Sequence, residues 1–391
     1  LAGLLAVSFS PNALAKDKPV SLSVTQLGTI PGSDRWDWWQ ARTTPIVTKE
    51  GSLWLTTMSE TGKKVSHDFH DIYESVSRDR GMTWSTPEKI APLSRIRTDD
   101  GYEVAAGDLW PGFHAKSRMV LSTGKTFNFA DGTKENFLRE RVLYAVMDPG
   151  TNEWSPMKFL DVPEKDHGGF PMLAANAGTT QRWDLANGDV LLPVRYQRNK
   201  EKRIYTSVVM RCSFDGRELK YIEHGSEHEI PEGRGLYEPS LIKFGGRFFL
   251  TLRADHSSYV TRGVDGINYE PAREWLFDDG TPLGSYNTQQ HWAVIGKGLF
   301  LIYTRKGADN DHIMRHRAPL FIGQVDPETL RVIRKSERIV FEENQATLGN
   351  SGVCRISSNE ALITCGEGLL RLGKRKGENN RVLFAIVRAR F

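Results

Sequence analysis

The sequence predicts an all-β fold and, within that class, a single six-bladed β-propeller. Short runs rich in strand-forming residues are separated by Gly, Asp and Asn throughout the chain, and no long stretch has the periodicity of an amphipathic helix. An Asp-containing turn recurs at intervals of roughly 50 to 70 residues, which is the size of one blade. The residues from Val20 to Phe391 therefore suffice for about six such blades.

The clearest copy of this turn is Ser77–Trp84, with the sequence SRDRGMTW. Its Asp can accept hydrogen bonds from backbone N–H groups, its Gly can adopt a positive φ, and its Trp would return the chain into the sheet. Weaker copies follow at Asp148 with Trp154, Asp215 with Tyr221, Asp265 with Tyr269, and Asp326. Ordinary hairpin turns would explain any one copy, but the nearly regular spacing favours a repeated blade.

The first strand is predicted to close the ring. Residues 20–30 would pair as the outer strand of the last blade, which removes the free edges of the sheets. A ring of seven blades would need blades of about 53 residues, shorter than the longest intervals between turns.

Composition disfavours several classes of partner. The 391 residues carry a formal net charge of +4 without a dense Lys/Arg tract, so nucleic-acid binding is not expected. No segment is long and apolar enough to cross a bilayer. We expect a monomer without a cofactor. We also expect no resident metal, because the group His67-Asp68-His70-Asp71 is too short to make a metal site by itself.

One feature indicates an address outside the cytoplasm, either secreted or periplasmic. Residues 1–15 form an apolar run that ends in Ala-Leu-Ala, as in a secretory signal peptide with its cleavage site, and the propeller domain would occupy residues 16–391. Cys354 and Cys365 flank a predicted hairpin and could pair in an oxidising compartment, leaving Cys212 as a buried thiol.

A hairpin in the middle of the chain brings together two charged residues. Glu238 and Arg253 stand 15 residues apart around the turn at Gly245-Gly246, so an antiparallel pairing puts both at the same open end. Repetition around the ring would add further arginines at that end: Arg42, Arg195 and Arg305. Several guanidinium groups around one pocket indicate a receptor for a carboxylate. The alternative is that these arginines brace the blades through ion pairs.

These segments resemble the sialidase superfamily over essentially the whole propeller domain. The form of Ser77–Trp84 is similar to the Asp-box of that superfamily, and Ala41–Val47 resembles the strand that carries the first arginine of its carboxylate-binding triad. Tyr237–Ser240, together with Arg253, resembles the segment with the catalytic Glu and the second arginine. The resemblance implies an exo-glycosidase that acts on an acidic sugar.

The resemblance also implies roles for individual residues. Arg42 and Arg253 would bind the carboxylate with a third arginine, which could be Arg305, Arg315 or Arg317. Asp68 or Asp71 would be the acid/base, and Glu238 would assist a tyrosine nucleophile.

The sequence departs from the family at that nucleophile. Sialidases carry it in a late blade, whereas Tyr303 is the last tyrosine of this chain, so Tyr303, Tyr286 or Tyr237 would have to serve. One rival interpretation is a uronate polysaccharide lyase in which His291 and a tyrosine remove a proton and the arginines clamp the carboxylate. A second rival is a glycan-binding propeller without catalysis.

Overall fold

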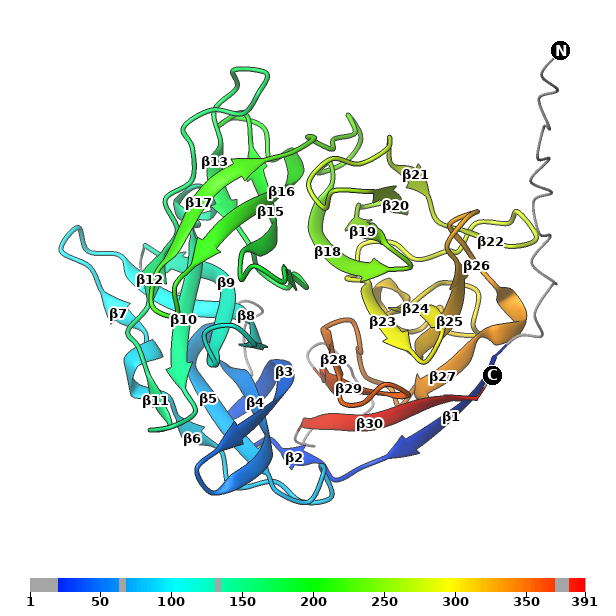
Figure 1. Cartoon of the computed structure of the whole chain (residues 1–391), viewed down its shortest axis with the longest axis horizontal. Helices are drawn as coiled ribbons and strands as arrows, with labels where there is room; N and C mark the ends of the chain where they lie inside the picture. The colour runs from blue at the N-terminus through cyan, green and yellow to red at the C-terminus, as the bar shows by residue number, and fades with distance from the viewer. Residues whose placement is uncertain (1–19, 63–67, 131–134, 370–379, 391) are drawn as a thin grey trace, which may run out of the picture.

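Six sheets surround a central axis in the computed structural model, which describes residues 20–62, 68–130, 135–369 and 380–390 (Figure 1). This arrangement confirms the predicted six-bladed β-propeller. The predicted signal peptide, residues 1–15, lies outside the described residues. No helix within the described ranges is long and apolar enough to cross a membrane.

Each blade is built from strands that are consecutive in the chain, except that the first two strands of the chain complete the last blade. Blade 1 contains β3 (Trp36–Thr48), β4 (Gly51–Gly62), β5 (Phe69–Ser77) and β6 (Glu88–Lys89). Blade 2 contains β7 (Ile96–Arg97), β8 (Glu103–His114), β9 (Met119–Phe129), β10 (Val142–Asp148), β11 (Glu153–Trp154) and β12 (Lys158–Phe159). Blade 3 contains β13 (Leu173–Asn176), β14 (Trp183–Asp184), β15 (Val190–Gln197), β16 (Tyr205–Phe214) and β17 (Leu219–His224).

The remaining blades complete the ring. Blade 4 contains β18 (Tyr237–Phe244), β19 (Arg247–Arg253), β20 (Ser258–Gly263) and β21 (Arg273–Glu274). Blade 5 contains β22 (Leu276–Phe277), β23 (His291–Ile295), β24 (Gly298–Tyr303), β25 (Leu320–Asp326), β26 (Arg331–Val332) and β27 (Arg338–Phe341). Blade 6 contains β28 (Ser351–Arg355), β29 (Glu360–Gly366), β30 (Arg381–Arg390), β1 (Ser21–Gln26) and β2 (Ile30–Pro31). Short 3-10 helices occur at η1 (Ala91–Leu93), η2 (Phe137–Arg139), η3 (Met314–His316) and η4 (Arg334–Ser336).

The predicted ring closure is confirmed. Strand β1 pairs antiparallel with β30, so that Ser21 faces Arg390 and Val24 faces Val387. The first strand of the described chain is thus the outer strand of the last blade, next to the C-terminal strand in Figure 1.

The five recurring aspartates occupy equivalent turns, each between the third and fourth strands of blades 1 to 5. In the first, the Asp79 carboxylate accepts hydrogen bonds from the backbone N–H of Thr83, at 2.9 Å, and from the Ser77 hydroxyl, at 2.8 Å. The other four likewise accept backbone N–H groups two or three residues further on: Asp148, Asp215, Asp265 and Asp326. An acceptor that satisfies the turn backbone explains why Asp recurs there.

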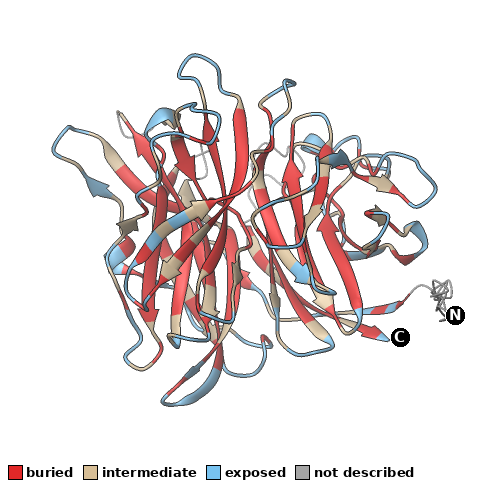
Figure 2. Ribbon diagram, turned by 45° about the horizontal axis from the view of Figure 1, so that its top comes forward, coloured by how far each residue is buried: buried red, intermediate tan, exposed pale blue. Residues whose placement is uncertain are grey.

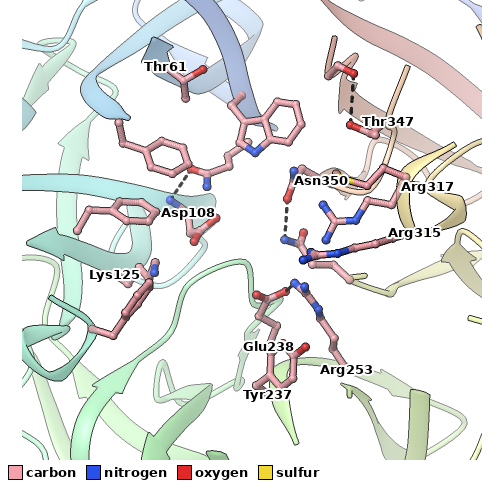
Figure 3. A pocket seen from close by; sticks show the side chains of 18 of the residues that line it. Thr61, Asp108, Lys125, Tyr237, Glu238, Arg253, Arg315, Arg317, Thr347 and Asn350 are labelled. Atoms are coloured by element: carbon pink, nitrogen blue, oxygen red, sulfur yellow. Dashed lines mark hydrogen bonds and ion pairs between the residues drawn. The ribbon is translucent and has the colours of Figure 1, made fainter. Parts of the chain in front are cut away.

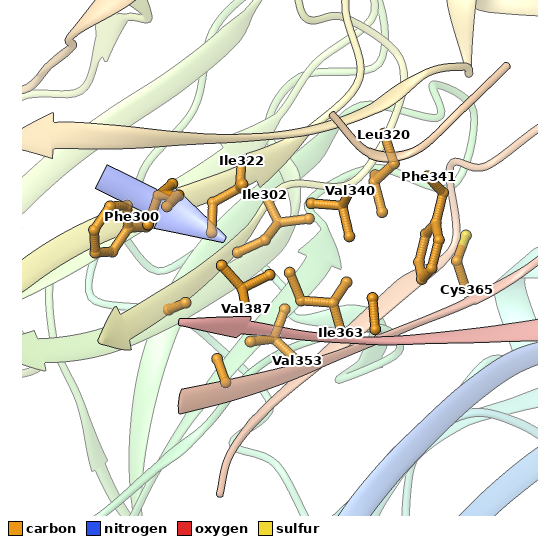
Figure 4. Packing of buried hydrophobic residues seen from close by; sticks show 14 of the residues in the cluster. Phe300, Ile302, Leu320, Ile322, Val340, Phe341, Val353, Ile363, Cys365 and Val387 are labelled. Carbon is orange, nitrogen blue, oxygen red and sulfur yellow. The ribbon is translucent and has the colours of Figure 1, made fainter. Parts of the chain in front are cut away.

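Hydrophobic side chains fill the space between neighbouring blades, and exposed residues concentrate in the connecting loops (Figure 2). Between blades 5 and 6, Ile302 and Ile322 meet Val353, Ile363 and Val387 (Figure 4). Burying each of these side chains stabilises the fold by about 1.5–3 kcal/mol. The hydrophobic side chains that alternate along the strands thus hold neighbouring blades together.

The possible Cys354–Cys365 disulfide does not form, because the hairpin register separates the two residues. Cys354 faces Leu362 across the β28–β29 pair, and Cys365 faces Ser351. All three cysteines, including the buried Cys212, are free thiols.

One backbone irregularity recurs near the start of every innermost segment. At this point in each blade a residue other than glycine has a φ between 47° and 55°: Gln40, Asp108, Ala174, Glu238, Asn287 and Gln345. The hairpin register shifts at this point in blades 1 to 4, as in a β-bulge. Left-handed conformations are costly for such residues and cluster at functional sites. The six residues therefore form a ring of strained positions around the central axis, where a functional site is expected.

Candidate active site

A cavity of about 390 Å³ opens where the ring of bulged residues lies. Three of these residues line it: Gln40, Asp108 and Glu238. The charged residues of its described lining are mainly cationic, with the carboxylates Asp37, Asp108 and Glu238 set against Lys125, Arg195, Arg203, Arg234, Arg253, Arg315 and Arg317. Figure 3 shows Arg253, Arg315 and Arg317 on one side of the cavity and Asp108 with Lys125 on the other.

Blades 2 and 4 present the same acid–base arrangement. In the β8–β9 hairpin, Asp108 directly follows Gly107, the residue that pairs with Lys125. In the β18–β19 hairpin, Glu238 directly follows Tyr237, the residue that pairs with Arg253. Each bulge therefore turns a carboxylate into the cavity beside a cation on the neighbouring strand.

The two carboxylates differ in their affinity for a proton. Burial raises the pKa of Asp108 to about 6; Lys125 lowers it and Glu238 raises it further. Burial alone would also raise the pKa of Glu238, but the ion pair with Arg253, at 2.5 Å, together with Arg195 and Arg317, lowers it to about 2. Near pH 6 the pocket therefore holds one carboxyl group ready to give up a proton and one permanent anion.

The wall formed by blades 4 and 5 has more positive charge than its carboxylates neutralise. Arg253 pairs with Glu238, and Arg234 pairs with Asp255 at 2.6 Å. Arg317 is 7% exposed and donates from Nη2 to the Asn287 carbonyl at 2.9 Å. It forms no ion pair with any described residue, and its Nε has no hydrogen-bond partner among them.

The cations of this wall lie close enough to one another to lower the pKa values of two of them. Burial, followed by the charges of Arg253 and Arg315, lowers the pKa of Arg317 to about 9. Burial and Arg253 lower the pKa of Arg315 as well. A guanidinium whose pKa is depressed by other cations is stabilised when an anion binds beside it.

The wall formed by blades 2 and 3 is different, because two of its cations, Lys125 and Arg195, share one buried carboxylate. Glu140 lies 2.7 Å from Lys125 Nζ and 3.0 Å from Arg195 Nη2. Burial lowers the pKa values of both cations, but Glu140, together with Glu135 and Asp108 at Lys125 and with Tyr205 and Glu238 at Arg195, raises them above the ordinary range. This pairing is the bracing role that was the alternative for the predicted arginine cluster.

Six of the residues expected at the site line the cavity: Arg195, Tyr237, Glu238, Arg253, Arg315 and Arg317. Arg42 does not reach it. Arg42 lies beneath the cavity, fully buried over the ring of Trp110, and donates to the Gln40 carbonyl and to Gln289 Oε1. The bulged residue Gln40 occupies the place equivalent to Glu238, so Arg42 falls two residues beyond it, where Ser240 lies in blade 4.

Two residues expected at the site, Arg305 and Tyr303, lie outside the described lining of the cavity. Both side chains bind Glu337: Tyr303 donates its hydroxyl at 2.5 Å and Arg305 donates from Nη2 at 2.6 Å. Glu337 directly precedes β27, which pairs with β25 away from the innermost strand of blade 5. Tyr303 is packed among the hydrophobic residues of that blade.

His291 and Asp68 also lie outside the described lining of the cavity. His291 is fully buried below it, with Nδ1 at 2.9 Å from the Ser240 hydroxyl. Asp68 lies next to Gly62, which lines the cavity, and its Oδ1 is 3.0 Å from His70 Nε2. Its neighbour Asp71 pairs with Lys89 at 2.5 Å. His67 is outside the described residues.

Sequence reasoning missed Asp108, Lys125, Arg203 and Arg234. The usable signal for the first two was the repeat itself, since Asp108 and Lys125 take the places of Glu238 and Arg253 in an equivalent hairpin. Arg315, one of the candidates for the third arginine, lies in η3 and lines the cavity.

Comparison with solved structures finds propellers of the same fold. The chain is 13% identical to a sialidase of Trypanosoma rangeli, with a TM-score of 0.61 over 93% of this chain and 59% of that protein. It is also 13% identical to an α-L-arabinofuranosidase of Fusarium graminearum, with a TM-score of 0.58 over 92% and 98% of the two chains. A protein of unknown function from Dyadobacter fermentans gives 0.64 at 13% identity, over 94% and 99%.

No protein-family model and no curated protein matches the chain. The structural similarities show a sialidase-like propeller fold that is also used by another glycosidase. At this identity they do not fix the activity, which has to be argued from the site.

Proposed function

We propose that the protein is an exported, sialidase-like exo-glycosidase that hydrolyses the glycosidic bond of a sugar carrying a carboxylate. The observation that carries the proposal is the arginine wall of blades 4 and 5, defined by Arg253, Arg315 and Arg317. A buried guanidinium without a counter-ion is costly, and a ligand carboxylate would offset that cost through charge-assisted, two-pronged hydrogen bonds. Export rests on the apolar segment at residues 1–15.

The pair of carboxyl groups supplies the chemistry. Asp108, with a pKa of about 6, would donate its proton to the leaving oxygen as the glycosidic C–O bond breaks. Glu238, whose pKa is about 2, stays ionised and would stabilise the positive charge that develops on the sugar ring. Water supplies the hydroxyl group at the anomeric carbon, and its remaining proton restores Asp108.

The tyrosines of the described lining do not support a tyrosyl intermediate. Tyr237 directly precedes Glu238, but its hydroxyl accepts from Arg234 Nη2 at 2.6 Å and donates to Asp255 Oδ1 at 2.7 Å. Burial raises the pKa of Tyr237 to about 12, which makes its hydroxyl a poor nucleophile. Tyr205 lies against Arg195, whose guanidinium is 3.9 Å from the ring centroid.

The rival activities have less support. A lyase needs a base near the acidic carbon, yet no histidine occurs among the described residues that line the cavity. A binding protein without catalysis would not need a carboxyl group with a pKa of about 6 beside an ionised one.

A panel of fluorogenic glycosides tests the proposal. The protein is incubated with an α-sialoside, a β-glucuronide, an α-iduronide and, as the neutral comparison, an α-L-arabinofuranoside. We expect turnover of at least one acidic glycoside, no turnover of the neutral one, and loss of turnover in Asp108→Asn. Cleavage of the arabinofuranoside alone would overturn the carboxylate requirement. New near-ultraviolet absorbance from uronate polysaccharides would indicate a lyase, and binding without turnover would leave a glycan-binding protein.

A further inference from the structure

Three side chains on blade 3, outside the cavity, converge on one point. His167 lies in the connection before β13, and His224 and Glu227 lie at and just after the end of β17. One ligand atom from each of the three falls within 4.8 Å of the others. None of these residues belongs to the described lining of the cavity, so the group is independent of the proposed hydrolase function.

The distances match the edges of a metal coordination sphere. Glu227 Oε1 is 3.4 Å from His167 Nδ1 and 3.4 Å from His224 Nε2. Two ligand atoms bound tetrahedrally to zinc at about 2.0–2.1 Å lie about 3.3 Å apart. The two imidazole rings are stacked, with centroids 4.1 Å apart and planes at 13°, so both can direct a nitrogen to the same side.

One of these nitrogens has no other function in the described structure. The side chain of His224 is 3% exposed, and its Nε2 has no hydrogen-bond partner among the described residues. A buried polar atom left without a partner is costly, and native structures rarely keep one without a ligand.

The surroundings hold two of the ligands in place. The Tyr221 hydroxyl lies 2.8 Å from His224 Nδ1, and a metal on Nε2 would make Nδ1–H the donor to that hydroxyl. The backbone N–H of His167 donates to Glu227 Oε1 at 2.9 Å, which fixes that carboxylate beside the histidine. The side chain of His167 is 61% exposed, so the fourth position of a tetrahedron is open to water.

We propose that His167, His224 and Glu227 form a site for a divalent transition metal of the zinc class. Two neutral imidazoles and one carboxylate suit zinc, whereas calcium and magnesium prefer a shell made of oxygen atoms. The bound ion joins the connection before β13 to the outer edge of blade 3. Its effect is on stability and not on the chemistry of the cavity.

Calorimetric titration with Zn²⁺, on untagged protein stripped of metal, tests the site. We expect one saturable Zn²⁺ per chain, a rise of a few degrees in Tm, and no comparable effect of Mg²⁺. His224→Ala and Glu227→Gln should each weaken binding at least tenfold, and Tyr221→Phe should weaken it by about 10–100-fold. His312→Ala removes an exposed histidine paired with a different glutamate, Glu343, and should bind Zn²⁺ as the parent does.

Two further readouts keep the test decisive if a variant is poorly folded. Co²⁺ bound at this site should give the visible absorption of a tetrahedral complex, and His167→Ala, a change at an exposed side chain, should abolish it without changing the metal-free Tm. Absence of saturable Zn²⁺ binding to the parent protein would overturn the proposal. Equal binding by the parent and the His167→Ala variant would overturn it as well.

Discussion

On the blade 2 and 3 side of the cavity, Lys125 and Arg195 share the buried carboxylate of Glu140, whereas on the blade 4 and 5 side Arg317 has no carboxylate partner among the described residues. The same kind of charge therefore has opposite consequences. Glu140 raises the pKa values of its two partners, while burial and neighbouring cations lower the pKa of Arg317. Cations with a partner brace the fold, and a cation without one is available to a ligand.

The largest expected effect concerns the acid on the braced wall. Asp108→Asn should lower kcat by about 10²–10⁴-fold, because a general acid contributes on that scale, and should change KM little. Steady-state kinetics on the best acidic glycoside measures both parameters. The parallel variant Asp68→Asn tests the residue expected from the family resemblance; a loss of kcat confined to Asp68→Asn would reverse the assignment.

Breaking the braced wall should damage stability. Glu140→Gln leaves Lys125 and Arg195 buried without their shared anion, so we expect the free energy of unfolding to fall by about 3–5 kcal/mol. Denaturant titration measures this change. The matched control is Glu50→Gln, which removes the ion pair between the exposed side chains of Glu50 and Arg78. This change should lower the free energy of unfolding by less than about 1 kcal/mol. Equal losses in the two variants would show that Glu140 has no special role.

Removing the unpaired cation, Arg317, should lower the affinity for ligand and leave stability intact. Arg317→Met should weaken binding of acidic sugars by about 10–100-fold, which corresponds to the loss of roughly 1.5–3 kcal/mol per hydrogen bond to a charged group. Its free energy of unfolding should stay the same or rise, because a buried cation crowded by Arg253 and Arg315 is removed while Glu238 keeps its ion pair with Arg253. Ligand titration and thermal unfolding separate the two effects. A large loss of stability with unchanged affinity would place Arg317 among the bracing residues.

The smallest expected effect is on the pH dependence of stability. The pKa of Asp108 is raised to about 6 in the folded protein, so the folded state binds this proton more tightly than the unfolded state does. Its favourable contribution is complete below about pH 4 and is lost as the pH rises to about 6, a change on the order of 2 kcal/mol. Asp108→Asn should therefore be more stable than the parent at pH 7 and not at pH 4. Identical pH profiles would contradict the raised pKa.

Much of the fold was accessible from the sequence because it repeats. The aspartate turns lie between the third and fourth strands of five blades, and a local hydrogen-bonding need makes Asp recur there. Counting residues around the hairpin also placed Glu238 beside Arg253 correctly. Both inferences depend on short-range geometry that the chain encodes directly.

The site was only partly accessible, because bulges and burial are not visible in a strand pattern. Counting the hairpin of blade 1 in the same way missed the bulge at Gln40 and put Arg42 in the cavity instead of beneath it. The side chain of Arg305 donates to Glu337, a partner 32 residues away in the chain, and does not reach the cavity. Whether an arginine is paired or free depends on such distant partners, which the local sequence does not specify.

The central claim is that the arginine wall recognises a carboxylate. The direct measurement is the affinity of the parent protein for sialic acid and for glucuronic acid, each compared with its own methyl ester, and the same comparison in Arg317→Met. The account predicts that at least one free acid binds ten times more tightly than its ester, and that Arg317→Met removes most of this preference. Equal affinities of acid and ester in the parent protein, for both sugars, would contradict it.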